Sequence, residues 1–186
     1  MKIRKIFCLL GFVLAVTLFF VSKGWAATTP EIKPPVITNF YGIDHGVYGT
    51  IWKIYLEAEA GDKDMSKIVI VVEQPARGRL PVDWIYLKPQ YQKRLKGYIQ
   101  WNTFSSKASY LQEWTQITLK VSIFDKAGNE SNEVVFPFTF ESGVKDQYQY
   151  ELPAPFNEGE VPKLGNVFID LYNPFSMDGD GGAQGN

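Results

Sequence analysis

Two segments of the chain alternate apolar and polar residues with a period of two, and no other feature constrains the fold as strongly. The first segment is Gln116–Asp125, with apolar residues at Ile117, Leu119, Val121 and Ile123. The second spans residues 52–60, with apolar residues at Trp52, Ile54, Leu56, Ala58 and Ala60. Successive side chains of a strand point to opposite faces, so each segment predicts an antiparallel strand with one buried and one solvent-facing side.

Five further segments have strand character, and turn-forming residues separate them. They are residues 36–43, 67–73, 81–87, 96–102 and 133–140. Pro137 interrupts the last of them, which places that strand at a sheet edge or a bulge. No segment shows a helical stripe, and the best candidate for a short helical turn is residues 108–114. We therefore expect an all-β fold: an immunoglobulin-like antiparallel β-sandwich of about seven strands, followed by a Pro-rich C-terminal extension.

Two turns resemble those of a known family. Residues 121–131 read Val-Ser-Ile-Phe-Asp-Lys-Ala-Gly-Asn-Glu-Ser. This stretch resembles the closing hairpin of bacterial extracellular immunoglobulin-like and fibronectin-like repeats, in which an Asp-x-x-Gly-Asn-x-Ser turn joins the last two strands. Residues 57–64 are similar to the acidic turn that follows the second strand of those repeats. The resemblance implies the fold and no activity, and the chain contains a single such unit.

The first 26 residues have the order of a secretory signal peptide. Lys2, Arg4 and Lys5 precede an apolar run over residues 6–21, and small residues follow at Gly24 and Ala26. The run is shorter than the roughly 20 residues of a spanning helix. We expect cleavage after Ala26, no membrane span afterwards, and a periplasmic or extracellular location; a retained anchor is the alternative.

Cleavage would leave about 160 residues, enough for one ordinary domain with extensions. We expect a leader over residues 27–35, the sandwich over 36–142, a linker over 143–175 and a flexible tail over 176–186. Within the linker, residues 166–171 alternate again and are a possible extra edge strand. Removal of the segment would also remove Cys8, the only cysteine, so no disulfide would stabilise the domain.

The composition excludes several functions. The signal segment holds 4 of the 19 basic residues and none of the 20 acidic ones, so the remaining chain has a net charge of −5. A mildly acidic chain without a basic stripe does not favour nucleic acid. His45 is the only histidine and lies in a glycine-flanked turn, with no nucleophile motif beside it. The carboxylates of Glu57, Glu59, Asp62 and Asp64 are expected to be a solvated surface, which makes a carboxylate-dependent hydrolase the least favoured function.

Aromatic residues crowd the middle of the chain. Exposed aromatic rings stack on sugars or bind protein partners, whereas buried ones fill a core. We expect Trp52, Trp101 and Trp114 in the core. We favour the core interpretation for this cluster as a whole; if it binds a ligand, the candidate ligand-binding residues are Trp84, Tyr86 and Tyr98.

Two acidic turns are expected at one end of the sandwich. They hold Asp62, Asp64, Asp125 and Asn129, whose oxygens suit calcium. The competing interpretation is ordinary turn chemistry, which we favour because Lys63 and Lys126 lie within the turns and because neither turn has the spacing of a dedicated calcium loop. We expect no other cofactor.

The chain therefore predicts an exported, non-catalytic interaction module that binds a protein or cell-surface partner. The alternative is a carbohydrate-binding module that uses surface aromatic residues. The fold alone does not decide between them.

Overall fold

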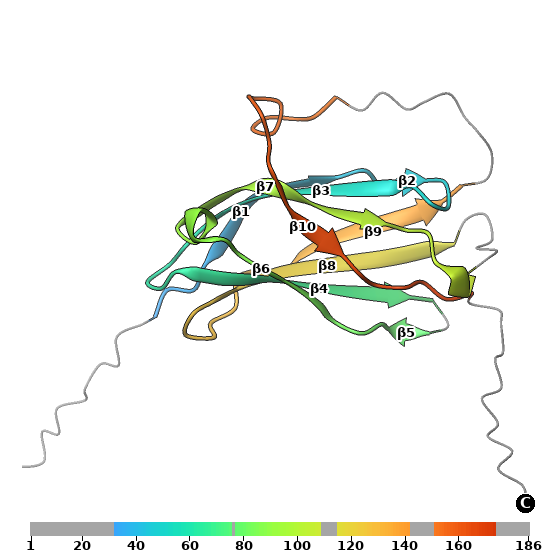
Figure 1. Ribbon diagram of the computed structural model, residues 1–186, viewed down its shortest axis with the longest axis horizontal. Helices are drawn as coiled ribbons and strands as arrows, with labels where there is room; N and C mark the ends of the chain where they lie inside the picture. The colour runs from blue at the N-terminus through green and yellow to red at the C-terminus, as the bar shows by residue number, and fades with distance from the viewer. Residues whose placement is uncertain (1–31, 76, 109–114, 142–150, 174–186) are drawn as a thin grey trace, which may run out of the picture. The chain divides into compact units, whose positions relative to one another are not determined.

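The computed structural model describes residues 32–75, 77–108, 115–141 and 151–173 of the chain, and in this part the chain forms two β-sheets (Figure 1). The first sheet has the order β1-β3-β7-β10, and the second has the order β2-β9-β8-β4, with both β5 and β6 pairing to β4. The first sheet consists of β1 (Val36–Gly42), β3 (Ile51–Glu59), β7 (Arg94–Asn102) and β10 (Lys163–Val167). The second consists of β2 (His45–Gly46), β4 (Met65–Gln74), β5 (Gly78–Arg79), β6 (Asp83–Tyr86), β8 (Gln116–Asp125) and β9 (Val134–Phe140).

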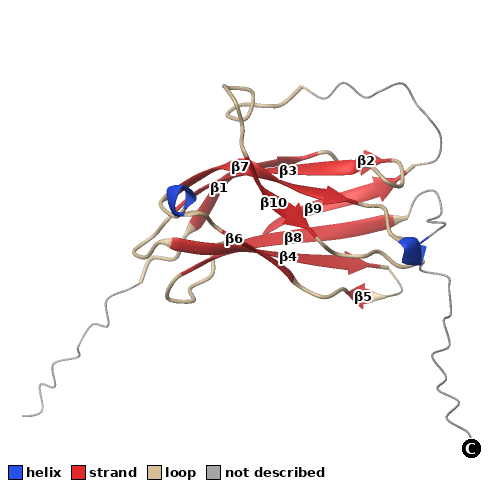
Figure 2. Cartoon of the chain, viewed as in Figure 1, coloured by secondary structure: helices blue, strands red, loops and turns tan. Residues whose placement is uncertain are grey.

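The strand order is that of an immunoglobulin-like sandwich. The strands β1, β3 and β7 take the positions of A, B and E in one sheet, while β4, β8 and β9 take those of C, F and G in the other. All of these neighbours pair antiparallel. The expected fold class is therefore confirmed. Figure 2 shows that the described chain is otherwise loop, apart from two short 3-10 turns, η1 (Pro89–Tyr91) and η2 (Ser106–Ala108).

The alternating residues form the core between the sheets. On β3, Trp52, Ile54, Leu56 and Ala58 are at most 1% exposed, and β8 buries its apolar residues in the same way. The Trp52 ring lies 4.5 Å from that of Phe138 and 6.1 Å from that of Trp101, measured between ring centroids. Each fully buried side chain of this size contributes about 1.5–3 kcal/mol through removal of apolar area from water.

The structure corrects one local expectation, at His45, and adds two short strands. His45 does not lie in an open turn but in β2, which pairs parallel with the end of β9. The strands β2 and β5 have two residues each, too short for an alternating pattern to reveal. The expected helical turn at 108–114 and the expected core residue Trp114 lie largely outside the described residues; only Ala108 is described, at the end of η2.

The C-terminal segment adds a strand that the immunoglobulin pattern lacks. The strand β10 pairs parallel with β7 and contacts β6, so it lies at the sandwich edge between the two sheets (Figure 1). A Cβ atom at Gly165 would lie 2.6 Å from the side chain of Ile85, so only glycine permits this approach to β6. The extra edge strand begins three residues before the expected range of 166–171, and the later part of that range continues without sheet pairing. Its side chains nevertheless alternate: Val167, Ile169 and Leu171 are buried.

Candidate functional site

Trp84 and Tyr86 share the outer face of β6. They are 51% and 68% exposed, whereas Ile85 between them is buried. The Nζ atom of Lys67 on the neighbouring strand β4 lies 4.2 Å from the centroid of the Trp84 ring and 5.5 Å from that of Phe124 on β8. Such geometry is a cation–π interaction, which orients the lysine between the two rings. We call Lys67, Trp84, Tyr86 and Phe124 the aromatic face.

Tyr98 does not belong to this face. It lies on β7 in the first sheet, where its ring is half-buried and 5.5 Å from that of Tyr55. Phe156, from the C-terminal extension, is buried against Tyr55 on the same side of the sheet. Burial, with smaller contributions from Tyr98 and Tyr41, raises the pKa of Tyr55 above its ordinary value. The three candidate ligand-binding residues are therefore divided between two sheets.

The two acidic turns lie next to each other, but lysine side chains form ion pairs with the Asp64 carboxylate at their junction. The backbone N–H of Lys126 donates to the carbonyl of Asp64 at 2.9 Å. The Asp64 carboxylate is 2.5 Å from the Nζ atom of Lys93 and 3.1 Å from that of Lys126. Hydrogen bonds from these two lysines hold the pKa of Asp64 below its ordinary value.

The other oxygen donors of these turns are also engaged. Asp125 is buried and accepts hydrogen bonds from the backbone N–H groups of Ala127 and Asn129 and from the Asn129 side chain, each at 2.8 Å. Asp62 accepts the Lys33 N–H at 2.9 Å. In the described ranges, no group of three or more acidic, histidine or cysteine residues has an arrangement that could hold a metal ion.

The carboxylates considered for hydrolysis have separate partners as well. Glu57 accepts a 2.7 Å hydrogen bond from Asn39, and Glu59 forms a 3.2 Å ion pair with Arg94. The His45 ring contacts Asp44 at 2.6 Å between Nδ1 and Oδ1.

A polar groove lies beside β7 and the C-terminal segment, and none of its residues was a sequence candidate. It has a cavity volume of about 490 Å³. Its lining residues are Gln100, Asn102, Phe104, Asn166, Val167, Phe168, Ile169 and Asp170. The volume falls in the range of small-molecule sites, roughly 300–1,000 Å³.

The groove is built from two segments that run in the same direction. Gln100 pairs in register with Asn166, and Trp101 with Val167. Trp101 and Thr103 are buried, so Gln100, Asn102 and Phe104 face outward. In the same way Asn166, Phe168 and Asp170 are exposed, whereas Val167, Ile169 and Leu171 are buried. The alternation over residues 166–171 separates Phe168 and Asp170 from the apolar residues between them, but it does not identify the neighbouring segment.

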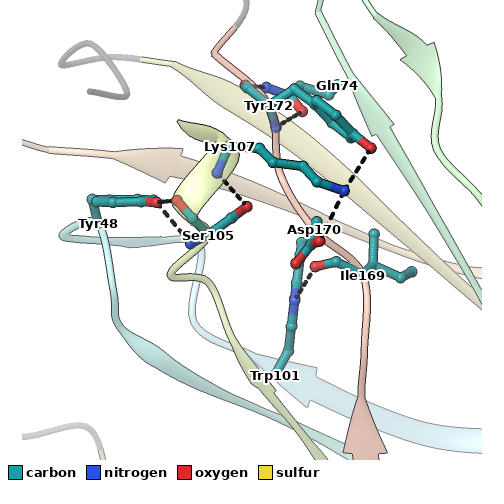
Figure 3. Close-up of polar contacts among 8 residues, drawn as sticks. All are labelled: Tyr48, Gln74, Trp101, Ser105, Lys107, Ile169, Asp170 and Tyr172. Atoms are coloured by element: carbon teal, nitrogen blue, oxygen red, sulfur yellow. Dashed lines mark hydrogen bonds and ion pairs between the residues drawn. The ribbon is translucent and has the colours of Figure 1, made fainter. Parts of the chain in front are cut away.

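Buried and ordered contacts fix the shape of the groove. The indole Nε1 of Trp101 donates to the carbonyl of Ile169 at 3.0 Å (Figure 3). Lys107 connects Asp170, 3.2 Å from its Nζ, with the Tyr172 hydroxyl at 3.3 Å. The hydrogen bond to Tyr172, and to a lesser extent the one to Asp170, raises the pKa of Lys107 above its ordinary value. The Phe104 ring packs 5.7 Å from that of Tyr48, whose hydroxyl bonds to the backbone of Ser105.

Comparisons with known proteins add little to this description. No family model matches the chain, and no curated protein matches it. Among solved structures, it is similar to the CARDB domain of a protein from Pyrococcus furiosus, determined in complex with di-metal ions. The match has 10% identity and a TM-score of 0.33, and covers 59% of this chain and 90% of that one. A likeness at this level carries no inference about metal binding or function.

No helix in the described residues is long and apolar enough to cross a membrane.

Proposed function

We propose that the protein is an exported, non-catalytic interaction module that binds a protein partner through the aromatic face. The observation that carries the proposal is the pair Trp84 and Tyr86, half or more exposed side by side on one strand. Tryptophan and tyrosine contribute large apolar area at little cost in conformational entropy, and they dominate the binding energy of many protein interfaces.

Lys67 defines the partner further. Its charge lies above the Trp84 ring and near Phe124, so it needs no rearrangement to meet an acidic group. The expected partner surface is therefore apolar with a carboxylate near its centre, since a fixed cation favours a complementary anion.

The other parts of the proposal rest on the chain's chemistry. The N-terminal segment and the turn signatures of bacterial extracellular repeats support export to the periplasm or the cell exterior. The non-catalytic assignment rests on a single histidine and on carboxylates that already have partners. A glycan surface made of Trp84, Tyr86 and Tyr98 is not favoured, because Tyr98 lies on the other sheet.

The test begins with export. We expect mass spectrometry of the protein from expressing bacteria to find Ala27 as the first residue, in the periplasm or the medium. A cytoplasmic protein that retains Met1 would contradict export.

The partner is then identified by its contact with the aromatic face. A photo-crosslinking residue in place of Tyr86 should capture one protein in intact cells, while the same residue in place of Phe40 should not. Phe40 is the matched control, because it is 49% exposed and lies on the other sheet.

The purified partner should bind the Trp84→Ala and Tyr86→Ala variants at least about tenfold more weakly than the unaltered protein, with unchanged melting temperatures. The Phe40→Ala variant should bind normally. Equal binding by all variants would contradict the role of the aromatic face.

A further inference from the structure

We infer that the polar groove is a second binding site, and that its ligand is a neutral oligosaccharide. It lies along the first sheet and the C-terminal segment, so the inference is independent of the aromatic face and of any protein partner. Three features lead to it: the chemistry of the lining groups, their net charge and their rigidity.

The lining groups match a polyhydroxylated ring. Gln100, Asn102 and Asn166 line the groove, and the Oδ1 atom of Asn102 already accepts the Phe104 N–H at 3.1 Å. Each amide offers one acceptor oxygen and two donor hydrogens, which suits hydroxyl groups that both donate and accept. Within the described part of the chain, the amides of Gln100 and Asn166 form no hydrogen bond with another residue, so they are available to a ligand.

Two exposed aromatic rings border these amides, one from each segment. Phe104 is 61% exposed and Phe168 is 79% exposed. The face of an aromatic ring carries partial negative charge and attracts the C–H groups of a sugar ring. Without a ligand, the apolar area of the two exposed phenylalanines stays in water, which is unfavourable; a bound sugar ring would cover part of it.

The charge of the groove favours a neutral ligand. Of the described residues that line it, Asp170 alone is ionisable, and the Nζ atom of Lys107 lies 3.2 Å from its carboxylate. A phosphate or carboxylate ligand would meet no cation among the described lining residues, whereas a cation would compete with Lys107 for Asp170.

The floor of the groove is held in place before a ligand binds. Trp101 and Ile169 are buried and joined by a hydrogen bond, and Thr103 is tied to the Thr50 carbonyl at 3.1 Å. A site that is already ordered loses little entropy on binding, which lets a few hydrogen bonds and ring contacts produce measurable affinity.

The experiment uses the protein as purified after export, titrated with hexasaccharides of glucose, xylose, mannose and N-acetylglucosamine, and with polygalacturonate as a charged control. Binding is followed by nuclear magnetic resonance at ligand concentrations up to the millimolar range. We expect at least one neutral hexasaccharide to shift the side-chain amide signals of Gln100 and Asn166, and polygalacturonate to leave them unchanged.

Variants then locate the site. Phe168→Ala should weaken binding of that hexasaccharide about tenfold, and Asn166→Ala should also weaken it, both with a melting temperature close to that of the unaltered protein. Tyr86→Ala is the matched control, since its side chain is similarly exposed on the other sheet; it should bind the sugar normally.

Four results would overturn the inference: no neutral hexasaccharide binds, only the charged polymer binds, the amide signals do not respond, or Phe168→Ala and Asn166→Ala both bind normally. None of these results would bear on the protein partner, because the partner assay depends on Trp84 and Tyr86 alone.

Discussion

The side-chain amide of Gln74 forms hydrogen bonds with both backbone groups of Tyr172. The Tyr172 N–H donates to Gln74 Oε1 at 3.0 Å, and Gln74 Nε2 donates to the Tyr172 carbonyl (Figure 3). Gln74 is the last residue of β4 and is 1% exposed. Its side-chain amide makes the two hydrogen bonds to the C-terminal segment that the backbone of a neighbouring strand would otherwise make. This contact holds the segment that supplies Asn166, Phe168 and Asp170 to the polar groove.

Replacement of Gln74 by leucine should lower the free energy of unfolding by about 1–3 kcal/mol, because it removes both hydrogen bonds and leaves their partners unsatisfied. Hydrogen exchange at the Tyr172 amide should become faster as well. Gln90→Leu, at an exposed glutamine, should change stability by less than about 0.5 kcal/mol. Unchanged exchange at Tyr172 would show that the amide does not hold the segment.

The two core tryptophans should respond differently to the same substitution. Both are buried, but Trp101 donates to Ile169 while Trp52 Nε1 has no hydrogen-bond partner in the described structure. Trp101→Phe leaves the Ile169 carbonyl without its hydrogen-bond donor, whereas Trp52→Phe removes a donor that has no acceptor. Urea unfolding should therefore show Trp101→Phe to be the more destabilising variant by about 1–3 kcal/mol; equal losses would contradict this account.

Asp125 should make the fold sensitive to acid. Burial alone would raise its pKa, but the hydrogen bonds from Asn129 and Ala127 outweigh burial and lower the pKa below its ordinary value. A carboxylate with a depressed folded-state pKa stabilises the fold above the unfolded-state pKa of about 3.9, and this stabilisation is lost as pH falls toward the folded-state value.

Asp125→Asn should therefore be less stable than the unaltered protein at pH 7, and the difference should shrink below about pH 4. Thermal unfolding across this range measures both effects. A constant difference at every pH would mean that the charge of Asp125 does not contribute.

Calcium should leave the melting temperature unchanged. A ligand that binds only the folded state raises its stability, but the Asp64 carboxylate is already paired with Lys93 and Lys126, and Asp125 is bonded within its turn. Thermal unfolding in millimolar calcium and in chelator is the measurement. A rise in melting temperature that is lost in Asp64→Asn would establish a metal site at these turns.

Much of the fold could be read from local patterns. The segment Gln116–Asp125 forms β8 with the expected bounds, and the other expected strands shift by a few residues at their ends. The burial of Trp52 and Trp101 follows from the same alternation. The strands β2 and β5 were not predicted, because two residues are too few to show an alternating pattern.

The residues of the candidate site were harder to predict from the sequence than the strands were. Alternation placed Tyr98 opposite the buried Trp101 on its own strand, but the exposure of Trp84 and Tyr86 became evident only in the structure. Alternation does not say which sheet a strand joins. Tyr98 therefore entered the same candidate surface as Trp84, although β6 and β7 belong to different sheets.

The sequence by itself determined which side chains of each strand are buried, because burial alternates with a local period that neighbouring residues reveal. Only the tertiary structure decided which strands became neighbours. The parallel pairing of β10 with β7 depends on a glycine that fits beside Ile85 and on hydrogen bonds between residues far apart in the chain. Those contacts bring Phe104 and Phe168 to one groove, and no local period records them, because each forms only when the distant segments pack together.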